Sequence, residues 1–135
     1  MTNTVLNATM VSELVSVSYR DLTAAATTQT LTLKTLNPYA KVLGVAALIN
    51  TAFVGPTAVS VEIGDNSTAN AYLSSFDVKQ AAGTESVGSA AHANDDIDGT
   101  SYVKAKFTSS GGNLNTCTAG QVTIQITYLH TLVPA

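Results

Sequence analysis

The sequence predicts an all-β domain, an antiparallel β-sandwich of about eight strands, of which a jelly roll is one form. Three observations favour this class. Apolar and polar residues alternate in most of the apolar segments, as they do on strands with one buried face. Turn residues separate these segments at short intervals, and no segment has a convincing helical period. The 135 residues suit one domain with one core.

The N-terminal residues 1–12 mix Thr and Asn with Val5, Leu6, Met10 and Val11 in no clean period. Two interpretations stay open, a frayed terminus and an extended arm that orders against a neighbouring subunit. Because the segment carries these apolar residues, we assign residues 1–12 to an arm. Residues 13–135 then form a single β-sandwich domain.

The first two predicted strands follow this arm. From residue 13, Val15, Val17 and Tyr19 share one parity and serines occupy the other. The segment of residues 23–28 is short and flanked by Thr, so we interpret it as a connection rather than a helix. Alternation returns over residues 30–36, and an Asn-Pro pair then predicts a turn.

The middle of the chain holds three further strands. Residues 41–51 are apolar at both parities, which predicts a strand covered on both faces, although periodicity leaves a buried helix open. Gly44 marks a bulge or a close backbone approach. Residues 59–63 alternate between Val or Ile and polar residues, and residues 71–78 place Tyr72, Ser74, Phe76 and Val78 on one face.

The last third contains two long loops and two clear strands. Residues 80–99 are rich in Ala, Gly, Ser and Asp, so they form a functional projection or hide a short strand near residues 85–87. Residues 101–107 alternate again. After a second loop at 109–120, residues 121–132 form the clearest strand, with Val and Ile on one face and Thr and Gln on the other.

The composition favours some classes of function and argues against others. Charged residues make up 11% of the chain, against about 25% in a typical domain, which favours a protein that works inside an assembly. Six Lys and Arg residues and a net charge of −3 argue against nucleic-acid binding. The longest apolar run, residues 42–49, is too short to span a bilayer, and residues 1–12 do not resemble a secretory signal. We therefore expect no membrane partner and assembly in a host cytoplasm.

One segment resembles part of a metal site. Asn94, Asp96, Asp98 and Gly99 match the first half of a calcium loop, in which oxygen ligands precede a glycine. The twelfth position counted from Asn94 is Ala105, which has no carboxylate. We interpret the segment as a solvated acidic turn and expect no metal, while a short loop site that uses backbone carbonyls stays open.

No residue pattern predicts catalysis or a cofactor. His92 and His130 lie far apart in the sequence, without a serine or cysteine nucleophile held beside either of them. Cys117 is the single cysteine and has no basic neighbour to lower its pKa, so neither an internal disulfide nor a reactive thiol is expected. The chain has no Trp and its five Tyr are scattered, which leaves glycan binding a weaker alternative. We expect a protein that is not an enzyme.

Several stretches resemble small virion proteins of tailed bacteriophages. They cover about half of the chain in order: residues 19–36, 40–53, 58–65, 71–83 and 118–129. The resemblance is one of overall pattern and includes no catalytic motif. It implies a β-rich structural component of the particle. Some members of this group decorate the head as trimers on the capsid lattice.

The resemblance therefore implies a capsid decoration, or cement, protein on the exterior of the virion. It would bind the major capsid protein as a homotrimer and bridge neighbouring shell subunits. We expect the contact residues in the arm, namely Val5, Leu6, Met10 and Val11, with Leu132 and Val133 as the second choice. Deletion of residues 2–12 should then abolish head binding and leave the domain folded. The alternative is a neck, tail or fibre component that binds a protein or a glycan.

Overall fold

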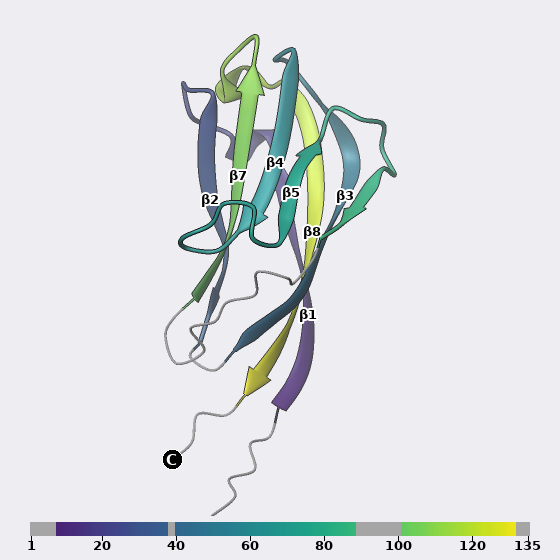
Figure 1. Cartoon of the computed structure of the whole chain (residues 1–135). Helices are drawn as coiled ribbons and strands as arrows, with labels where there is room; N and C mark the ends of the chain where they lie inside the picture. The colour runs from purple at the N-terminus through teal and green to yellow at the C-terminus, as the bar shows by residue number, and fades with distance from the viewer. Residues whose placement is uncertain (1–7, 38–39, 89–100, 132–135) are drawn as a thin grey trace, which may run out of the picture.

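The computed structural model describes residues 8–37, 40–88 and 101–131, and its strands form two antiparallel sheets packed face to face (Figure 1). One sheet has the order β1 (Ala8–Ser18), β8 (Ala119–Thr131), β3 (Lys41–Val54), β6 (Glu85–Val87), and the other β2 (Thr28–Leu36), β7 (Ser101–Ser110), β4 (Ala58–Gly64), β5 (Leu73–Asp77). The predicted all-β sandwich of about eight strands is confirmed.

The strand order is that of a jelly roll. Strand β1 pairs with β8, β2 with β7, β3 with β6 and β4 with β5, all antiparallel, so the chain resembles one long hairpin rolled into two layers. The β8–β3 and β7–β4 pairings then close each sheet. This topology brings the first and last strands side by side.

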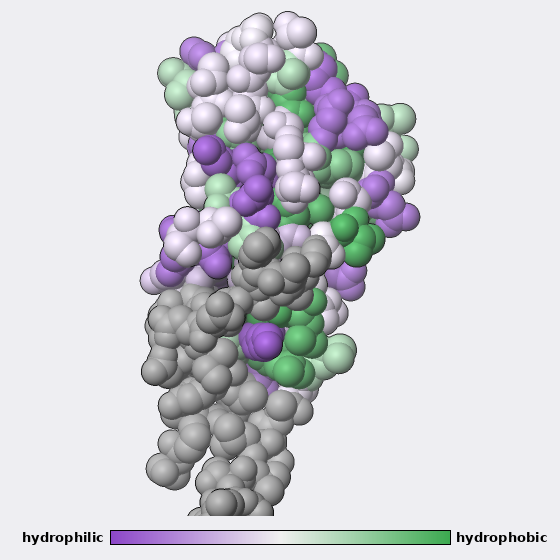
Figure 2. Space-filling view, in the orientation of Figure 1, coloured by the Kyte–Doolittle hydropathy of each residue, from purple (hydrophilic) through white to green (hydrophobic). Residues whose placement is uncertain are grey.

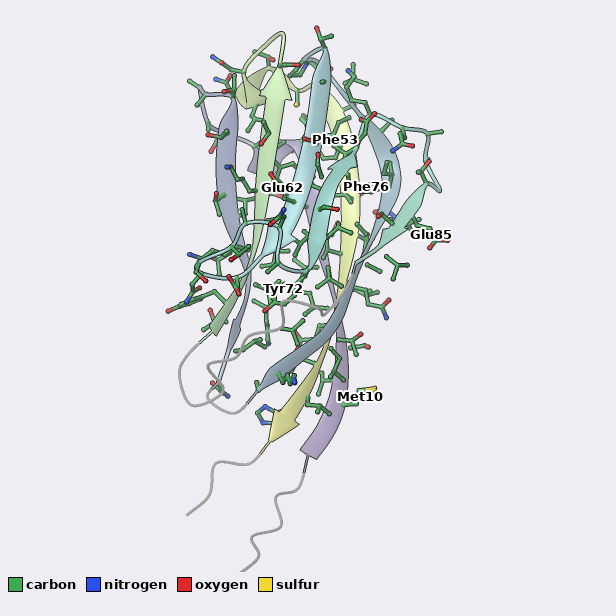
Figure 3. The ribbon with its side chains drawn as sticks, viewed as in Figure 1. Met10, Phe53, Glu62, Tyr72, Phe76 and Glu85 are labelled. Carbon is green, nitrogen blue, oxygen red and sulfur yellow. The ribbon has the colours of Figure 1, made fainter. Side chains whose placement is uncertain are left out.

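The core lies between the sheets and comes from the alternation seen in the sequence. On β8, Val122, Ile124, Ile126 and Tyr128 are buried, as predicted. Phe53, Tyr72 and Phe76, labelled in Figure 3, are also buried in this core. The ring centroids of Phe53 and Phe107 are 6.0 Å apart. Each large buried side chain contributes about 1.5–3 kcal/mol by its removal from water, so these rows carry most of the stability.

Gly120 is the point of closest approach in this core. Its φ is +141°, a backbone conformation that side chains disfavour, and a Cβ built there would collide with the Phe53 ring. The absence of a side chain at Gly120 therefore allows β8 to pass directly over the Phe53 ring.

Two details of the predicted strands were wrong, namely the regular face of residues 71–78 and the covering of residues 41–51 on both faces. The pairing of β4 with β5 steps from Val61↔Phe76 to Ile63↔Leu73, which leaves one extra residue on β5. This bulge buries Leu73 and exposes Ser74, so the expected regular face that included Ser74 does not form. Strand β3 shifts register beside Gly44, so the bulge expected there is confirmed. The outward side of β3 is partly open rather than covered, with Leu48 and Val54 exposed.

Other details agree with the sequence. The short strand expected near residues 85–87 is β6, and residues 41–51 are strand rather than helix. The connection after β1 holds a single 3-10 turn, Tyr19–Asp21, where the Ser18 amide donates to Asp21 Oδ2 at 2.9 Å. Within the described ranges, no helix is long and apolar enough to cross a membrane.

The N-terminal strand is longer than expected. Strand β1 begins at Ala8, and residues 8–12 pair with residues 127–131 of β8. The predicted boundary at residue 13 therefore falls inside a strand. Residues 1–7 lie outside the described residues.

Candidate functional site

The two outward faces of the sandwich differ in chemistry. On the β2-β7-β4-β5 sheet, Glu62 lies opposite Lys106, Lys104 lies opposite Thr32, and Asp77 lies opposite Ser60. Figure 2 views the molecule from this side, where hydrophilic residues are spread over the surface. Charges of both signs in such an arrangement are typical of a face that stays in water.

The outward face of the β1-β8-β3-β6 sheet, called here the neutral face, is different. It consists of Met10, Ser12, Leu14 and Ser16 on β1, the odd-numbered residues 119–129 on β8, Lys41, Gly44, Ala46, Leu48, Thr51 and Val54 on β3, and Glu85 and Val87 on β6. In the described part of the chain, every exposed large hydrophobic side chain belongs to this face: Met10, Leu14, Leu48, Val54 and Val87. Figure 3 shows Met10 projecting away from the sandwich.

Charge is sparse on the neutral face. Among its described residues only Lys41 and Glu85 belong to the charged residue types, and they lie on different strands, Lys41 opposite Leu129 and Glu85 opposite Leu48. An apolar patch bounded by neutral polar groups is typical of a protein contact surface.

The polar side chains of this face bond to one another. Ser12 Oγ and Thr127 Oγ1 are 2.9 Å apart, and Gln121 Nε2 donates to Ser16 Oγ at 2.7 Å. Asn50, which adjoins the face on β3, accepts from Thr123 Oγ1 at 2.6 Å. These side chains keep hydrogen-bond partners on the same face when water is removed. The free energy of desolvation that opposes covering the face is therefore reduced.

Two shallow hollows lie on the neutral face. The first, of about 340 Å³, lies among Leu14, Leu48 and Thr123, and the second, of about 360 Å³, lies among Gly44, Val87 and Thr127. A third hollow of about 380 Å³ lies on the opposite sheet, beside Lys104 and Lys106 and the loop at Asp65. In the first two hollows, exposed apolar side chains lie beside a concave surface. Such a surface suits a protein partner of complementary shape.

A charged clamp closes the sandwich beside the neutral face. Lys34 of β2 lies 3.1 Å from Glu13 of β1, and the Tyr128 hydroxyl donates to Glu13 Oε1 at 3.0 Å. The hydrogen bond from Lys34 lowers the pKa of Glu13, and the same contact raises the pKa of Lys34. Burial, with the Glu13 contact second, raises the pKa of Tyr128. The clamp ties the edge strands of the two sheets together.

The predicted contact residues separate into three groups. Met10 is exposed on the neutral face, as a contact residue should be, and Val11 is partly buried and packs against the core. Val5, Leu6, Leu132 and Val133 lie outside the described residues. The contact assignment itself stays a prediction.

Of the other candidate residues, only His130 and Cys117 lie in the described part of the chain. His92 and the acidic turn at residues 94–99 lie outside the described residues. His130 is partly exposed on β8, and Cys117 is buried, which raises the pKa of its thiol. Within residues 8–37, 40–88 and 101–131, no group of three or more His, Cys, Asp or Glu could hold a metal.

The exposed apolar residues Leu14, Leu48 and Val87 were missed by the sequence analysis. For Leu14 the signal was present, because Leu14 breaks the alternation of an otherwise regular strand, whereas Leu48 lies in a segment that is apolar at both parities. A hydrophobic residue at a polar parity predicts an outward apolar side chain.

Comparison with known proteins gives a likeness of fold. No protein-family model matches the chain, and no curated protein matches it. Among solved structures, a chain of the cyanophage Pam1 capsid asymmetric unit superposes with a TM-score of 0.57 at 19% identity, over 96% of this chain and 90% of that one.

Two further phage capsids contain similar chains. One is the acid-stable capsid of Helicobacter pylori bacteriophage KHP30, with a TM-score of 0.56 at 14% identity, over 95% of this chain and 100% of the other. The second is the capsid of Ralstonia phage GP4, with a TM-score of 0.54 at 13% identity, over 95% and 86% of the two chains. Because each match covers most of both chains, the matched chains are similar in length to this one. This chain shares its fold with chains of phage capsids.

Proposed function

We propose that this chain is a structural protein of a bacteriophage virion that binds the exterior of the head as a decoration protein. The observation that carries the proposal is the neutral face, which holds all the exposed large hydrophobic side chains of the described residues and only two charges. The likeness of fold to chains of three phage capsids supports a place in the virion. Its partner would be the major capsid protein.

The two faces would have separate roles. The neutral face would cover a seam between shell subunits, and the charged face of the opposite sheet would stay in water. The function is mechanical rather than catalytic, because covering apolar surface on the assembled shell adds binding free energy that favours the intact head.

The size of the neutral face indicates how binding would work. Its five apolar side chains have exposed fractions of 38–79%, equivalent to about three fully exposed side chains. At about 1.5–3 kcal/mol for each, covering them would contribute roughly 5–9 kcal/mol. Association costs about 4–15 kcal/mol in lost freedom. A single copy would therefore bind weakly, and several linked copies would bind much more strongly.

This energy balance agrees with the trimer that the family resemblance implies. Three linked copies would present three neutral faces to the lattice, so each contact after the first would be intramolecular. The mass of the free protein in solution tests this part of the proposal, and a monomer at all concentrations would contradict it.

A reconstitution experiment tests the head assignment. Heads that lack the protein are mixed with purified protein, and bound copies are counted by quantitative gel analysis. Saturable binding of many copies per head is expected. A few copies per particle would support the neck, tail or fibre alternative, and no binding would remove the head assignment.

A further inference from the structure

The free edge of β1 differs from the other three sheet edges. An exposed edge strand offers unpaired backbone groups to any other strand, and proteins usually block such edges with short strands, bulges or lysines. Strand β6 is three residues long, and β5 carries a bulge. Strand β2 has a register shift next to Lys34. Each of these three edges therefore has a blocking feature.

Strand β1 has none of these features. It is 11 residues long and pairs with β8 without a register shift, from Ala8↔Thr131 to Ser18↔Gln121. It contains no Pro, Lys or Arg. Within the described residues, its backbone hydrogen bonds run to β8 and no other segment bonds to its free side. Every second residue thus presents its N–H and C=O outward.

An inward charge is the remaining means of blocking an edge, and here it is neutralised. Glu13 is the one charged residue of β1, and Lys34 of the same chain already pairs with it at 3.1 Å. A strand added beside β1 would therefore not meet an uncompensated carboxylate.

We propose that β1 pairs antiparallel with β1 of a second copy of this chain, about a two-fold axis that passes through Ser12. Residues whose numbers sum to 24 then lie opposite one another. Met10 faces Leu14 of the second copy and Leu14 faces Met10, so two exposed apolar side chains find partners twice. These side chains have exposed fractions of 67% and 71%.

Other registers lack this agreement. An axis through Glu13 would place Met10 opposite Ser16 and Leu14 opposite Ser12, so neither apolar side chain would face another. An axis between two residues would place outward residues of one copy opposite inward residues of the other, because directly opposed residues share a face. The Ser12 axis keeps both neutral faces on the same side and joins them into one surface of eight strands.

The contact is small, so self-association in solution should be weak and should rise with concentration. On a lattice, neighbouring copies are held at a high effective concentration and the pairing becomes favourable. An isologous contact of this kind joins two copies, so a trimer would use a separate, heterologous contact. The inference concerns free protein and does not depend on head binding.

Cysteine cross-linking tests the register. In the proposed pair, two Ser12 residues face each other at a separation that a disulfide can span. Two Ser16 residues would be roughly 27 Å apart, eight residues along the strand. Ser12→Cys and Ser16→Cys are matched variants, because each loses one exposed hydroxyl hydrogen bond on the same strand. Cys117 is buried in both.

Under mild oxidation Ser12→Cys should form a covalent dimer at least tenfold faster than Ser16→Cys. Equal rates, a faster Ser16→Cys variant, or no cross-link in either would overturn the register.

A second pair of variants separates the edge from the face. Leu14 and Leu48 are both exposed leucines of the neutral face, but only Leu14 lies on the β1 edge. In analytical ultracentrifugation over a dilution series, the mass of the native chain and of Leu48→Glu should rise with concentration towards twice its value at low concentration, whereas the mass of Leu14→Glu should not. A doubling of mass for Leu14→Glu, or loss of the doubling in Leu48→Glu alone, would show that the copies do not associate through β1.

Discussion

Binding to the head should weaken when the apolar projections at the β3–β6 end of the neutral face are made polar. The variant is Leu48→Ser combined with Val87→Ser. Both side chains are exposed and border the two hollows of that face. Neither lies on the β1 edge, so the change leaves the proposed self-association contact intact.

The magnitude follows from exposure. Leu48 is 38% exposed and Val87 is 79% exposed, together slightly more than one fully exposed side chain. At about 1.5–3 kcal/mol for each side chain removed from water, the variant should lose roughly 2–3.5 kcal/mol of binding free energy. Since 1.4 kcal/mol is a factor of ten, head affinity should fall about 30- to 300-fold.

The assay is titration of heads that lack the protein, with bound and free protein separated by sedimentation. Thr30→Glu, an exposed position on the opposite sheet and opposite Lys106, is the control and should bind as the native chain does. The thermal midpoints of both variants should stay within about 2 °C of that of the native chain. Substitutions at exposed positions rarely change the free energy of unfolding by more than about 0.5 kcal/mol. Native affinity in the double variant would refute docking through the neutral face.

Three further predictions concern the fold and the arm. Gly120→Ala should lower the free energy of unfolding by about 3 kcal/mol, because a methyl group would collide with Phe53 at a φ that favours glycine. Glu13→Gln should lower that free energy by less than about 1 kcal/mol at neutral pH, because the pair with Lys34 is about one-third exposed. Deletion of residues 2–7 should weaken head binding and leave the unfolding transition unchanged, because described strands begin at residue 8.

Each of these has its own check. In denaturant titrations, Gly44→Ala should be nearly neutral, since a Cβ there meets nothing within 4 Å, and an equal loss in both glycine variants would contradict the steric argument. The folded-state pKa of Glu13 lies below its ordinary value of 4.5. Between these two pKa values the unfolded chain binds more protons than the folded chain, so the free energy of unfolding rises with pH there. The effect of Glu13→Gln should therefore vanish as pH falls through the folded pKa, and a constant difference would refute it.

The arm test uses a shorter deletion than the sequence suggested. Removal of residues 2–12 would take away five residues that pair with β8, so a loss of binding could come from a damaged strand. The shorter deletion avoids that ambiguity. Native head affinity after removal of residues 2–7 would exclude a contact role for Val5 and Leu6.

The fold was largely predictable because strand alternation is a local property. A buried row such as Val122, Ile124 and Ile126 could be identified from parity alone. The bulge on β5 was not predictable, because its extra residue is defined only by the partner strand β4, whereas Gly44 marked the register shift of β3 in the sequence. Strand order has the same limitation, since the pairing of β1 with β8 joins residues more than 100 positions apart in the sequence.

The neutral face was only partly predictable. Its low charge was visible in the composition, and Met10, which the sequence predicted as a contact residue, is exposed on this face. The gathering of Leu14, Leu48 and Val87 on one surface depends on which strands are neighbours, so it needed the topology. For Leu14 alone, its place at the polar parity of β1 was an available local signal.

Electron cryo-microscopy of the complete particle tests the central claim most directly. We expect many copies of this jelly roll in ordered positions on the outside of the head. Each copy should have the β1-β8-β3-β6 sheet against the shell and the β2-β7-β4-β5 sheet towards solvent. Density for the chain only at a vertex or along the tail, or copies that attach through the β2-β7-β4-β5 sheet, would contradict it.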